Sequence, residues 1–366
     1  MNFLQKIKKL LEIYGPIHYQ LFSRDLNTLL ICQALAKVLC ATTASNSQAR
    51  ARLRTAFFGS HPLISYSECL KDFGFDISFF CGDKNNVFIK YDDAAKLNAQ
   101  DFDCALVADE HNEEKLCALA SSHGLRPIRI MRLVNAHISV LKKMHFRSVK
   151  TCLHPYKQAI ITAAVGITNS SGTIVECGVF LGGTTVQIAL LNRELGIDRK
   201  IFALDTYEGM PKPTDKDFGG GFVYTAGMFS ENRHDLVQAY FRKAGVDQDI
   251  TIIKGLCQET LPSILSKNPQ VAFALLDTDQ YAGTKGGLDC IAPTLSADAI
   301  IIVDDTSVHG VDVAIKESLR TVPGLARFPT LFNFDIIRLI SPQQSRAKES
   351  HPGNNTSGHR LENNIN

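Results

Sequence analysis

Three aspartates stand where two apolar stretches of the chain end. Asp277 follows residues 271–276, and Asp304 and Asp305 follow residues 299–303. Continuous apolar runs are typical of parallel strands that helices cover on both faces, and ligands bind beyond the carboxyl ends of such strands. Carboxylates that converge there raise one another's pKa, and a divalent cation bound through oxygen atoms relieves the repulsion. The three aspartates are therefore a candidate metal site.

The alternative interpretation of these aspartates is structural, because an Asp at the end of a strand often caps the following helix. A second pattern upstream favours a binding site. Residues 173–177 predict a short strand, and a turn with Gly178, Gly182 and Gly183 leads from it into a helix that opens at Thr184. Glycines let the backbone approach a ligand closely, and a helix N-terminus attracts a carboxylate or phosphate.

Asp205 adds to this second pattern. It follows the next predicted strand, residues 200–204, and lies 22 residues after Gly183. Nucleotide-binding units place an acid about 20 residues after their glycine turn, where it accepts hydrogen bonds from ribose hydroxyls. The turn lacks the glycine spacing of dinucleotide-binding proteins, and the chain has no G-x-x-x-x-G-K-[ST] phosphate loop. A ligand with an adenosine, an amino-acid end and no phosphate remains, namely S-adenosylmethionine.

Five motifs in this order resemble the macrocin O-methyltransferase (TylF-type) family. They are Glu176-x-Gly178-x-x-x-Gly182-Gly183, Asp205-Thr206-Tyr207-Glu208-Gly209-Met210-Pro211, Lys254-Gly255-Leu256-x-x-Glu259-Thr260-Leu261-Pro262, Leu276-Asp277-x-Asp279-x-Tyr281 and Val303-Asp304-Asp305. The resemblance covers residues 150–340. It implies a class I methyltransferase fold of the Rossmann-like α/β type, S-adenosylmethionine as methyl donor and a magnesium ion.

The resemblance also implies a role for each matched residue. Glu176 and Gly178 would contact the methionine end of the donor, beside the glycine turn formed by Gly182, Gly183 and Thr184. Asp205 would bind the ribose, and Gly255 and Leu256 would border the adenine. Asp277, Asp304 and Asp305 would bind magnesium. The family usually has Gly at the position of Thr278 and an aromatic residue at that of Leu256. Both departures leave the charged positions filled.

The proton acceptor of the reaction is open. The more distant catechol O-methyltransferases have a lysine base where this chain has Gln280, and an amide cannot accept the proton. Magnesium on the acceptor oxygen would lower the pKa of that hydroxyl and fix its position. Asp277 is a candidate for metal ligand and proton acceptor together. His309, in the predicted loop before a helix at residues 311–320, is a second candidate base, or else a surface or capping residue.

The length of the chain, 366 residues with 45% hydrophobic residues, allows two domains with their own cores. We expect an N-terminal helical segment at 1–50, a small Rossmann-like α/β domain at 51–132, a connecting helix at 133–150, the methyltransferase domain at 151–341 and a disordered tail at 342–366. The first turn of the small domain, Gly59-Ser60-His61-Pro62, has a single glycine and a proline. We therefore expect no phosphate site there, but a substrate-presenting or dimer-forming role.

The amino-acid composition of the chain narrows the range of binding partners that we expect. A net charge of +2 argues against strong electrostatic attraction to nucleic acid or to a membrane, and the apolar stretch 26–41 is too short to span a bilayer comfortably. The ten cysteines show no metal-ligand spacing, which favours reduced thiols in the cytoplasm over disulfides or zinc. Residues 211–230, rich in Gly, Pro and Asp, predict a loop near the site.

Together these features predict a magnesium-dependent O-methyltransferase that uses S-adenosylmethionine. The family resemblance implies a hydroxyl of a sugar or of a glycosylated small molecule as acceptor, and a homo-oligomer is an open possibility. One alternative is methylation of a phenolic or other hydroxyl of a secondary metabolite. The other is a protein that binds the donor without catalysis.

Overall fold

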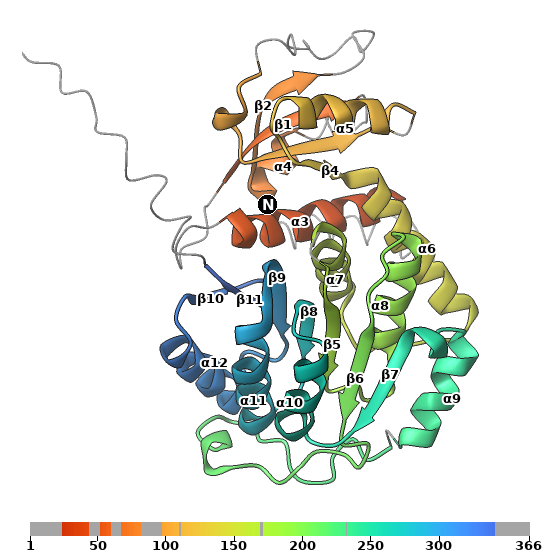
Figure 1. Cartoon of the computed structure of the whole chain (residues 1–366), viewed down its shortest axis with the longest axis vertical. Coiled ribbons are helices and arrows are strands. Elements are labelled where there is room, and N and C mark those ends of the chain that lie inside the picture. Colours follow the sequence, from red (N-terminus) through yellow and green to blue (C-terminus); the bar gives the residue numbers. More distant parts are fainter. Residues whose placement is uncertain are drawn as a thin grey trace, which may run out of the picture.

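Figure 1 shows the computed structural model of the chain, which describes residues 24–43, 52–59, 67–81, 97–109, 111–168, 171–231 and 233–340. The predicted tail at 342–366 and the first part of the predicted N-terminal helical segment lie outside these ranges. Within the described ranges, no helix is long and apolar enough to cross a membrane. The fold is α/β, with one sheet of seven strands and one of four.

The seven-stranded sheet lies in the C-terminal half of the chain. Its strands are β5 (Thr173–Cys177), β6 (Ile201–Asp205), β7 (Ile250–Lys254), β8 (Val271–Leu276), β9 (Leu295–Val303), β10 (Leu325–Phe328) and β11 (Asp335–Leu339). They are ordered β10-β11-β9-β8-β5-β6-β7, and β11 runs antiparallel to both of its neighbours while the other strand pairs are parallel. This is the strand order of class I methyltransferases, so the predicted fold class is confirmed.

Helices cover both faces of this sheet (Figure 1). They are α10 (Cys257–Lys267), α11 (Tyr281–Ile291) and α12 (His309–Thr321) on one face, and α7 (Pro155–Ile167), α8 (Gly183–Glu194) and α9 (His234–Ala244) on the other. Successive side chains of a strand point to opposite faces. In β9, Ile300 and Ile302 join the core below α7 and α8, and Ile301 joins the core below α10–α12. Two covered faces are the reason why β8 is apolar at every position.

The neighbouring strands β5 and β8 form the switch point of the sheet. The chain leaves β5 through α8 on one face and leaves β8 through α11 on the other, so a crevice opens beyond the carboxyl ends of these strands. Pairing continues one residue past each strand, because the Asp277 N–H donates to the Cys177 carbonyl (2.8 Å) and the Asp304 N–H to the Leu276 carbonyl (2.9 Å). Asp277 and Asp304 therefore follow adjacent strands at the same edge.

The four-stranded sheet is formed by the N-terminal part of the chain. Its elements are β1 (Leu53–Gly59), α4 (Ser67–Phe73), β2 (Phe75–Cys81), β3 (Cys104–Ala108), α5 (Glu113–Ser122) and β4 (Pro127–Arg129), with all strands parallel in the order β2-β1-β3-β4. Residues 60–62 of the predicted turn lie outside the described residues. The predicted absence of a phosphate site there stays a prediction.

Two helices join the sheets. The helix α6 (Ile130–Phe146) follows β4 and packs on α8, and α3 (Arg24–Thr43) packs on both α6 and α7. Buried side chains cover most of the surface of α3, and one continuous apolar core runs from the small sheet through α3 to α7 and α8. The apolar stretch 26–41 is thus a core helix between two sheets (Figure 1).

Candidate functional site

A cavity of about 510 Å³ opens at the carboxyl ends of β5, β6, β8 and β9. Its walls also include the segment before α7 and the loop between β6 and α9, residues 206–231, which we call the roof loop. Every residue predicted for the site lines this cavity except Gly182 and His309. The structure thus brings the predicted donor residues and the predicted metal residues together in one cavity.

The glycine turn after β5 is closely packed. Gly178 has φ +87°, and a Cβ atom there would overlap the backbone carbonyl of Asp277. Gly182 adopts the left-handed conformation (φ 83°) as the N-cap of α8, and a Cβ on Gly183 would overlap the carbonyl of Lys150. Glycine is required at these positions because a side chain would clash. The turn brings the N-terminus of α8, at Gly183 and Thr184, to the cavity wall.

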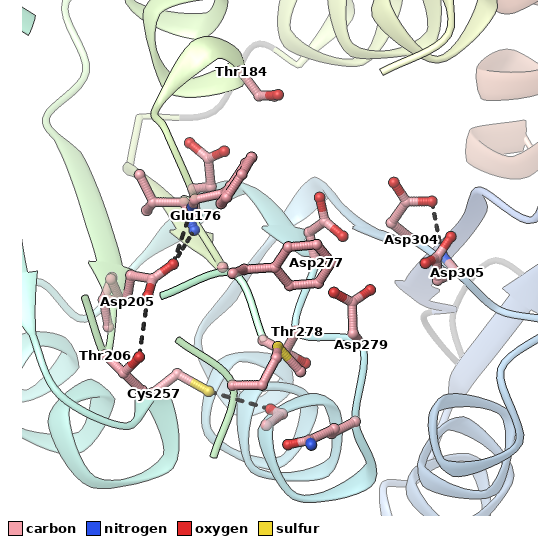
Figure 2. A pocket seen from close by; sticks show the side chains of 18 of the residues that line it. Glu176, Thr184, Asp205, Thr206, Cys257, Asp277, Thr278, Asp279, Asp304 and Asp305 are labelled. Atoms are coloured by element: carbon pink, nitrogen blue, oxygen red, sulfur yellow. Dashed lines mark hydrogen bonds between the residues drawn. The ribbon is translucent and has the colours of Figure 1, made fainter. Parts of the chain in front are cut away.

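Asp205 links the end of β6 to this turn. Its Oδ2 accepts hydrogen bonds from the N–H groups of Val179 (2.8 Å) and Phe180 (3.0 Å), and its Oδ1 accepts one from the N–H of Tyr207 (2.9 Å). Figure 2 shows this carboxylate pointing at the turn. Asp205 therefore fixes the shape of the glycine turn in addition to lining the cavity.

Glu176 is the buried acid among the residues predicted to bind the methyl donor. Its side chain is 1% exposed at the end of β5, and its Oε2 atom has no hydrogen-bond partner among the described residues. Burial raises the pKa of Glu176 to about 8. A buried carboxylate of this kind is costly unless a cation or a hydrogen-bond donor meets it. Glu176 lines the cavity, so a ligand there can supply that partner.

The residues that come directly after β7 form another wall of the cavity. The Gly255 N–H donates to the Asp205 carbonyl (2.9 Å), and Gly255 has φ +144°. Leu256, the N-cap of α10, is half-buried and lines the cavity. The predicted adenine border is thus a turn with an aliphatic side chain where the family usually has an aromatic one.

Four aspartates meet at the other end of the cavity (Figure 2). Burial, and then the charge of Asp304, raise the pKa of Asp277 well above its usual range. Burial, and then the charge of Asp305, raise the pKa of Asp279 to about 8. Asp279 and Asp305 both have left-handed backbones (φ 56° and 51°), which costs energy for residues other than glycine and is concentrated at functional sites. This acid cluster is therefore short of positive charge.

Lys157 of α7 supplies part of that charge. Its ammonium group forms an ion pair with the Asp304 Oδ1 and lies 3.9 Å from the Asp305 Oδ1. The same Asp304 oxygen accepts the N–H of Asp305 (2.7 Å), so the side chain of Asp304 is held from two sides. Burial raises the pKa of Asp304, and Lys157 opposes that rise. No sequence pattern indicates this contact, because 147 residues separate Lys157 from Asp304.

The fit of a magnesium ion rests on the donor atoms. Carboxylate oxygens are the ligands that Mg²⁺ prefers, and Asp277 and Asp279 keep raised pKa values even with Lys157 present. In the described part of the chain, however, no group of three or more His, Cys, Asp and Glu side chains is arranged to hold a metal ion. The carboxylate oxygens of the cluster are suitable ligands for the ion, while Lys157 lies against Asp304 and Asp305.

The roof loop closes the acid end with aromatic rings. The Tyr224 hydroxyl donates to the Asp305 Oδ2 (3.0 Å). Burial, and then the charges of Asp279 and Asp305, raise the pKa of Tyr224, so the hydroxyl stays protonated as a donor. The ring of Phe229 lies between those of Tyr224 (5.8 Å between centroids) and Phe180 (5.4 Å). These three rings line the cavity from the glycine turn to the acid cluster.

Comparison with known proteins supports the family resemblance of the second half of the chain. Residues 152–327 match the sequence model of the macrocin-O-methyltransferase (TylF) family. This segment is a TylF-family domain. The chain is 26% identical over 156 residues to the 8-demethyl-8-(2,3-dimethoxy-alpha-L-rhamnosyl)-tetracenomycin-C 4'-O-methyltransferase of Streptomyces olivaceus, a match that covers 40% of this chain and 57% of the relative. The mycinamicin III 3''-O-methyltransferase of Micromonospora griseorubida is 26% identical over 154 residues, 40% of this chain and 59% of the relative. The chain thus spans less than two thirds of the length of these relatives.

Two solved methyltransferase structures are also similar to the chain. The calicheamicin methyltransferase CalS11 is 23% identical, with a TM-score of 0.42, over 68% of this chain and 99% of that one. The O-methyltransferase NovP is 19% identical, with a TM-score of 0.40, over 58% of this chain and 80% of that one.

Two predicted residues of the TylF domain lie off the cavity wall. Gly182 sits within the turn, where a Cβ atom would meet the ring of Phe241. His309 is the first residue of α12 rather than part of the loop before it, and its ring lies against Gly219 and its Cβ against Gly220 of the roof loop. His309 therefore contacts the roof loop and is not among the residues that line the cavity. Its predicted role as a base stays a prediction.

Proposed function

We propose that this protein is an S-adenosylmethionine-dependent O-methyltransferase that acts on a hydroxyl of a sugar or of a glycosylated small molecule. The observation that carries the proposal is the single cavity with a donor-type half and an acid cluster at its other end. Membership of residues 152–327 in the TylF family supports it. The names of the two relatives describe O-methylation of a rhamnosyl tetracenomycin and of a mycinamicin, which supports a glycosylated acceptor.

The donor would bind in the half formed by β5, β6 and β7. Glu176, whose buried Oε2 has no partner among the described residues, suits the ammonium group of the methionine end. The N-terminus of α8 at Gly183 and Thr184 suits the carboxylate. Asp205 would accept the ribose hydroxyls, and Gly255 with Leu256 would border the adenine. The methyl group would then face the acid cluster, because both halves share the cavity.

Methyl transfer breaks the bond between the sulfonium sulfur and the methyl carbon and forms a bond from that carbon to the acceptor oxygen. The hydroxyl proton must go to a base. Asp279 suits this role because its pKa of about 8 lies close to neutral pH, where a proton acceptor is most effective. Asp277, which directly follows β8, is the alternative acceptor predicted from the sequence. The positive sulfonium nearby would favour the charged form of either carboxylate.

Magnesium remains part of the proposal. Asp277, Asp304 and Asp305 would hold it, and when bound the ion would lower the pKa of the acceptor hydroxyl. Lys157 would keep Asp304 oriented by its Oδ1 and leave the Oδ2 of that side chain for the cavity.

A phenolic or other hydroxyl of a secondary metabolite is the second candidate acceptor, and the aromatic rings of the roof loop are compatible with a phenol. The rings of Tyr224 and Phe229 line the cavity beside the acid cluster, where they suit an aromatic acceptor as well as the apolar part of a glycoside. An assay of methyl transfer with S-adenosylmethionine against matched glycosides and free phenols separates the two candidates. Transfer to the free phenols alone would overturn the sugar assignment. A protein that binds S-adenosylhomocysteine but methylates neither class would favour the non-catalytic alternative.

A further inference from the structure

The two arms of the roof loop converge on one buried amide. Gln280 is 3% exposed and follows the acid Asp279 directly. Its Nε2 donates to the carbonyl of Pro211 (3.1 Å) and to the carbonyl of Tyr224 (2.9 Å). A side-chain NH₂ group has two hydrogens to donate. Both are used on the roof loop, at points that lie 13 residues apart.

The next residue tethers the same loop a third time. The Tyr281 N–H, at the start of α11, donates to the Asp217 Oδ1 (2.6 Å). The other oxygen of this buried carboxylate accepts the N–H (2.7 Å) and the hydroxyl (2.8 Å) of Thr214. Gly310 makes the approach possible, because a Cβ atom there would overlap Asp217. The roof loop is thus fastened to the first residues of α11, which continue directly from the acid cluster.

The fastened loop decides what faces the acceptor end of the cavity. Tyr224, whose carbonyl Gln280 holds, donates its hydroxyl to the Asp305 Oδ2 at 3.0 Å. Its ring also contacts that of Phe229, and both line the cavity. If the amide did not hold the Tyr224 backbone, the Asp305 contact and the aromatic wall would lose their support together.

We propose that Gln280 is a positioning residue that holds the roof loop across the cavity and thereby places Tyr224 against Asp305. The role requires a side chain that donates twice, which an amide does and a carboxylate does not. The consequence for acceptor binding rests on the proposed function, whereas the consequence for the loop stands without it.

The test uses Gln280→Glu in the full-length protein. The shapes of the two side chains match, but an ionised carboxylate has no hydrogen to donate and a protonated one has a single hydrogen, so at least one of the two carbonyl oxygens loses its hydrogen bond. Hydrogen exchange should quicken at the loop amides of Thr214, Asp217 and Gly227, which are hydrogen-bonded within the loop. We expect at least about a fivefold increase, the effect of losing one ordinary hydrogen bond.

The matched control is Gln187→Glu. Gln187 is fully buried in α8 and donates to the Gln158 carbonyl (2.9 Å), away from the roof loop. Both variants place a new acid in the interior, so both should melt at a lower temperature, but the control should leave exchange of the loop amides unchanged. Equal loop exchange in both variants would mean that Gln280 acts on stability alone and would overturn the proposal. If Gln280→Glu does not fold, Gln280→Met removes the donors without a buried charge, and unchanged loop exchange in that variant would be equally decisive.

A spectroscopic readout adds a signature that general destabilisation does not move. The chain contains no tryptophan, so Phe229→Trp introduces a single indole between Phe180 and Tyr224. With Gln280→Glu, the indole emission should shift to longer wavelength and acrylamide should quench it more strongly under native conditions. With Gln187→Glu, neither should change. An indole signal that ignores Gln280→Glu would contradict the assigned role, whether or not the protein proves to be a methyltransferase.

Discussion

Replacement of Lys157 by Met should destabilise the protein in a way that depends on pH. The ammonium group contacts Asp304 and lies 3.9 Å from the Asp305 Oδ1, with the Lys157 side chain 13% exposed and that of Asp304 5% exposed. At an effective dielectric constant of about 20, unit charges at such a distance attract by roughly 4 kcal/mol. Loss of one partner of a buried ion pair costs about 3–5 kcal/mol. We therefore expect the free energy of unfolding at pH 8 to fall by about 3 kcal/mol.

The sign of the pH dependence follows from Asp304. Its pKa is already raised by burial, and loss of Lys157, which opposes that rise, would raise it further. A group whose pKa is higher in the folded than in the unfolded state stabilises the fold at low pH, and this contribution disappears as the pH rises through the folded-state pKa. The loss in Lys157→Met should therefore be smaller at pH 5 than at pH 8, by about 1.4 kcal/mol for each unit of added pKa shift.

Urea denaturation at both pH values measures the effect. The control is Lys316→Met, which removes an ion pair with Asp312 whose lysine side chain is 60% exposed, and such a surface pair contributes about 0–1 kcal/mol. A loss in Lys157→Met no larger than that of the control, or one of equal size at pH 5 and pH 8, would refute the view that Lys157 balances the acid cluster.

Three further predictions concern the donor and the metal. Asp205→Ala should weaken binding of S-adenosylhomocysteine about tenfold or more in calorimetry, since hydrogen bonds to a charged group contribute about 1.5–3 kcal/mol; an unchanged affinity would exclude Asp205 from the ribose contact. The affinity of the wild type should fall as the pH drops below about 8, because Glu176 with its raised pKa must lose a proton to meet the ammonium group. Glu176→Gln should bind more weakly with a flatter pH profile, and a profile like that of the wild type would contradict this. EDTA should abolish methyl transfer and magnesium restore it, with Asp304→Asn inactive but still able to bind the donor; full transfer in excess EDTA would remove magnesium from the account.

The strands that carry the site could be predicted because their signal is local. The strands predicted at 173–177 and 271–276 are β5 and β8 residue for residue, and both faces of each strand are covered. The strand β11, which lies between β10 and β9, could not be predicted because Asp335 and Arg338 interrupt its apolar pattern. Both side chains are buried, with Asp335 paired to Arg327 and Arg338 donating to the Ala41 carbonyl. In a sequence, such polar residues indicate a loop, because no local sequence pattern shows their hydrogen-bond and ion-pair partners.

The residues of the site also differ in whether a local sequence pattern could predict them. Glu176, Asp205 and the glycines sit at strand ends, so a sequence pattern could find them. Lys157 and Tyr224 reach the acid cluster from α7 and from the roof loop, and no spacing in the chain records those contacts. From the sequence, Gln280 is notable only as an amide that cannot act as a base. Its two hydrogen bonds to the roof loop became visible only in three dimensions.

The central claim, that this cavity binds the methyl donor, is tested most directly by calorimetric titration of the full-length wild-type protein with S-adenosylhomocysteine. The account predicts saturable binding of one ligand per chain with a Kd well below about 1 mM, which corresponds to about −4.1 kcal/mol. Absence of any binding heat at millimolar ligand, confirmed by an unchanged melting temperature, would contradict it.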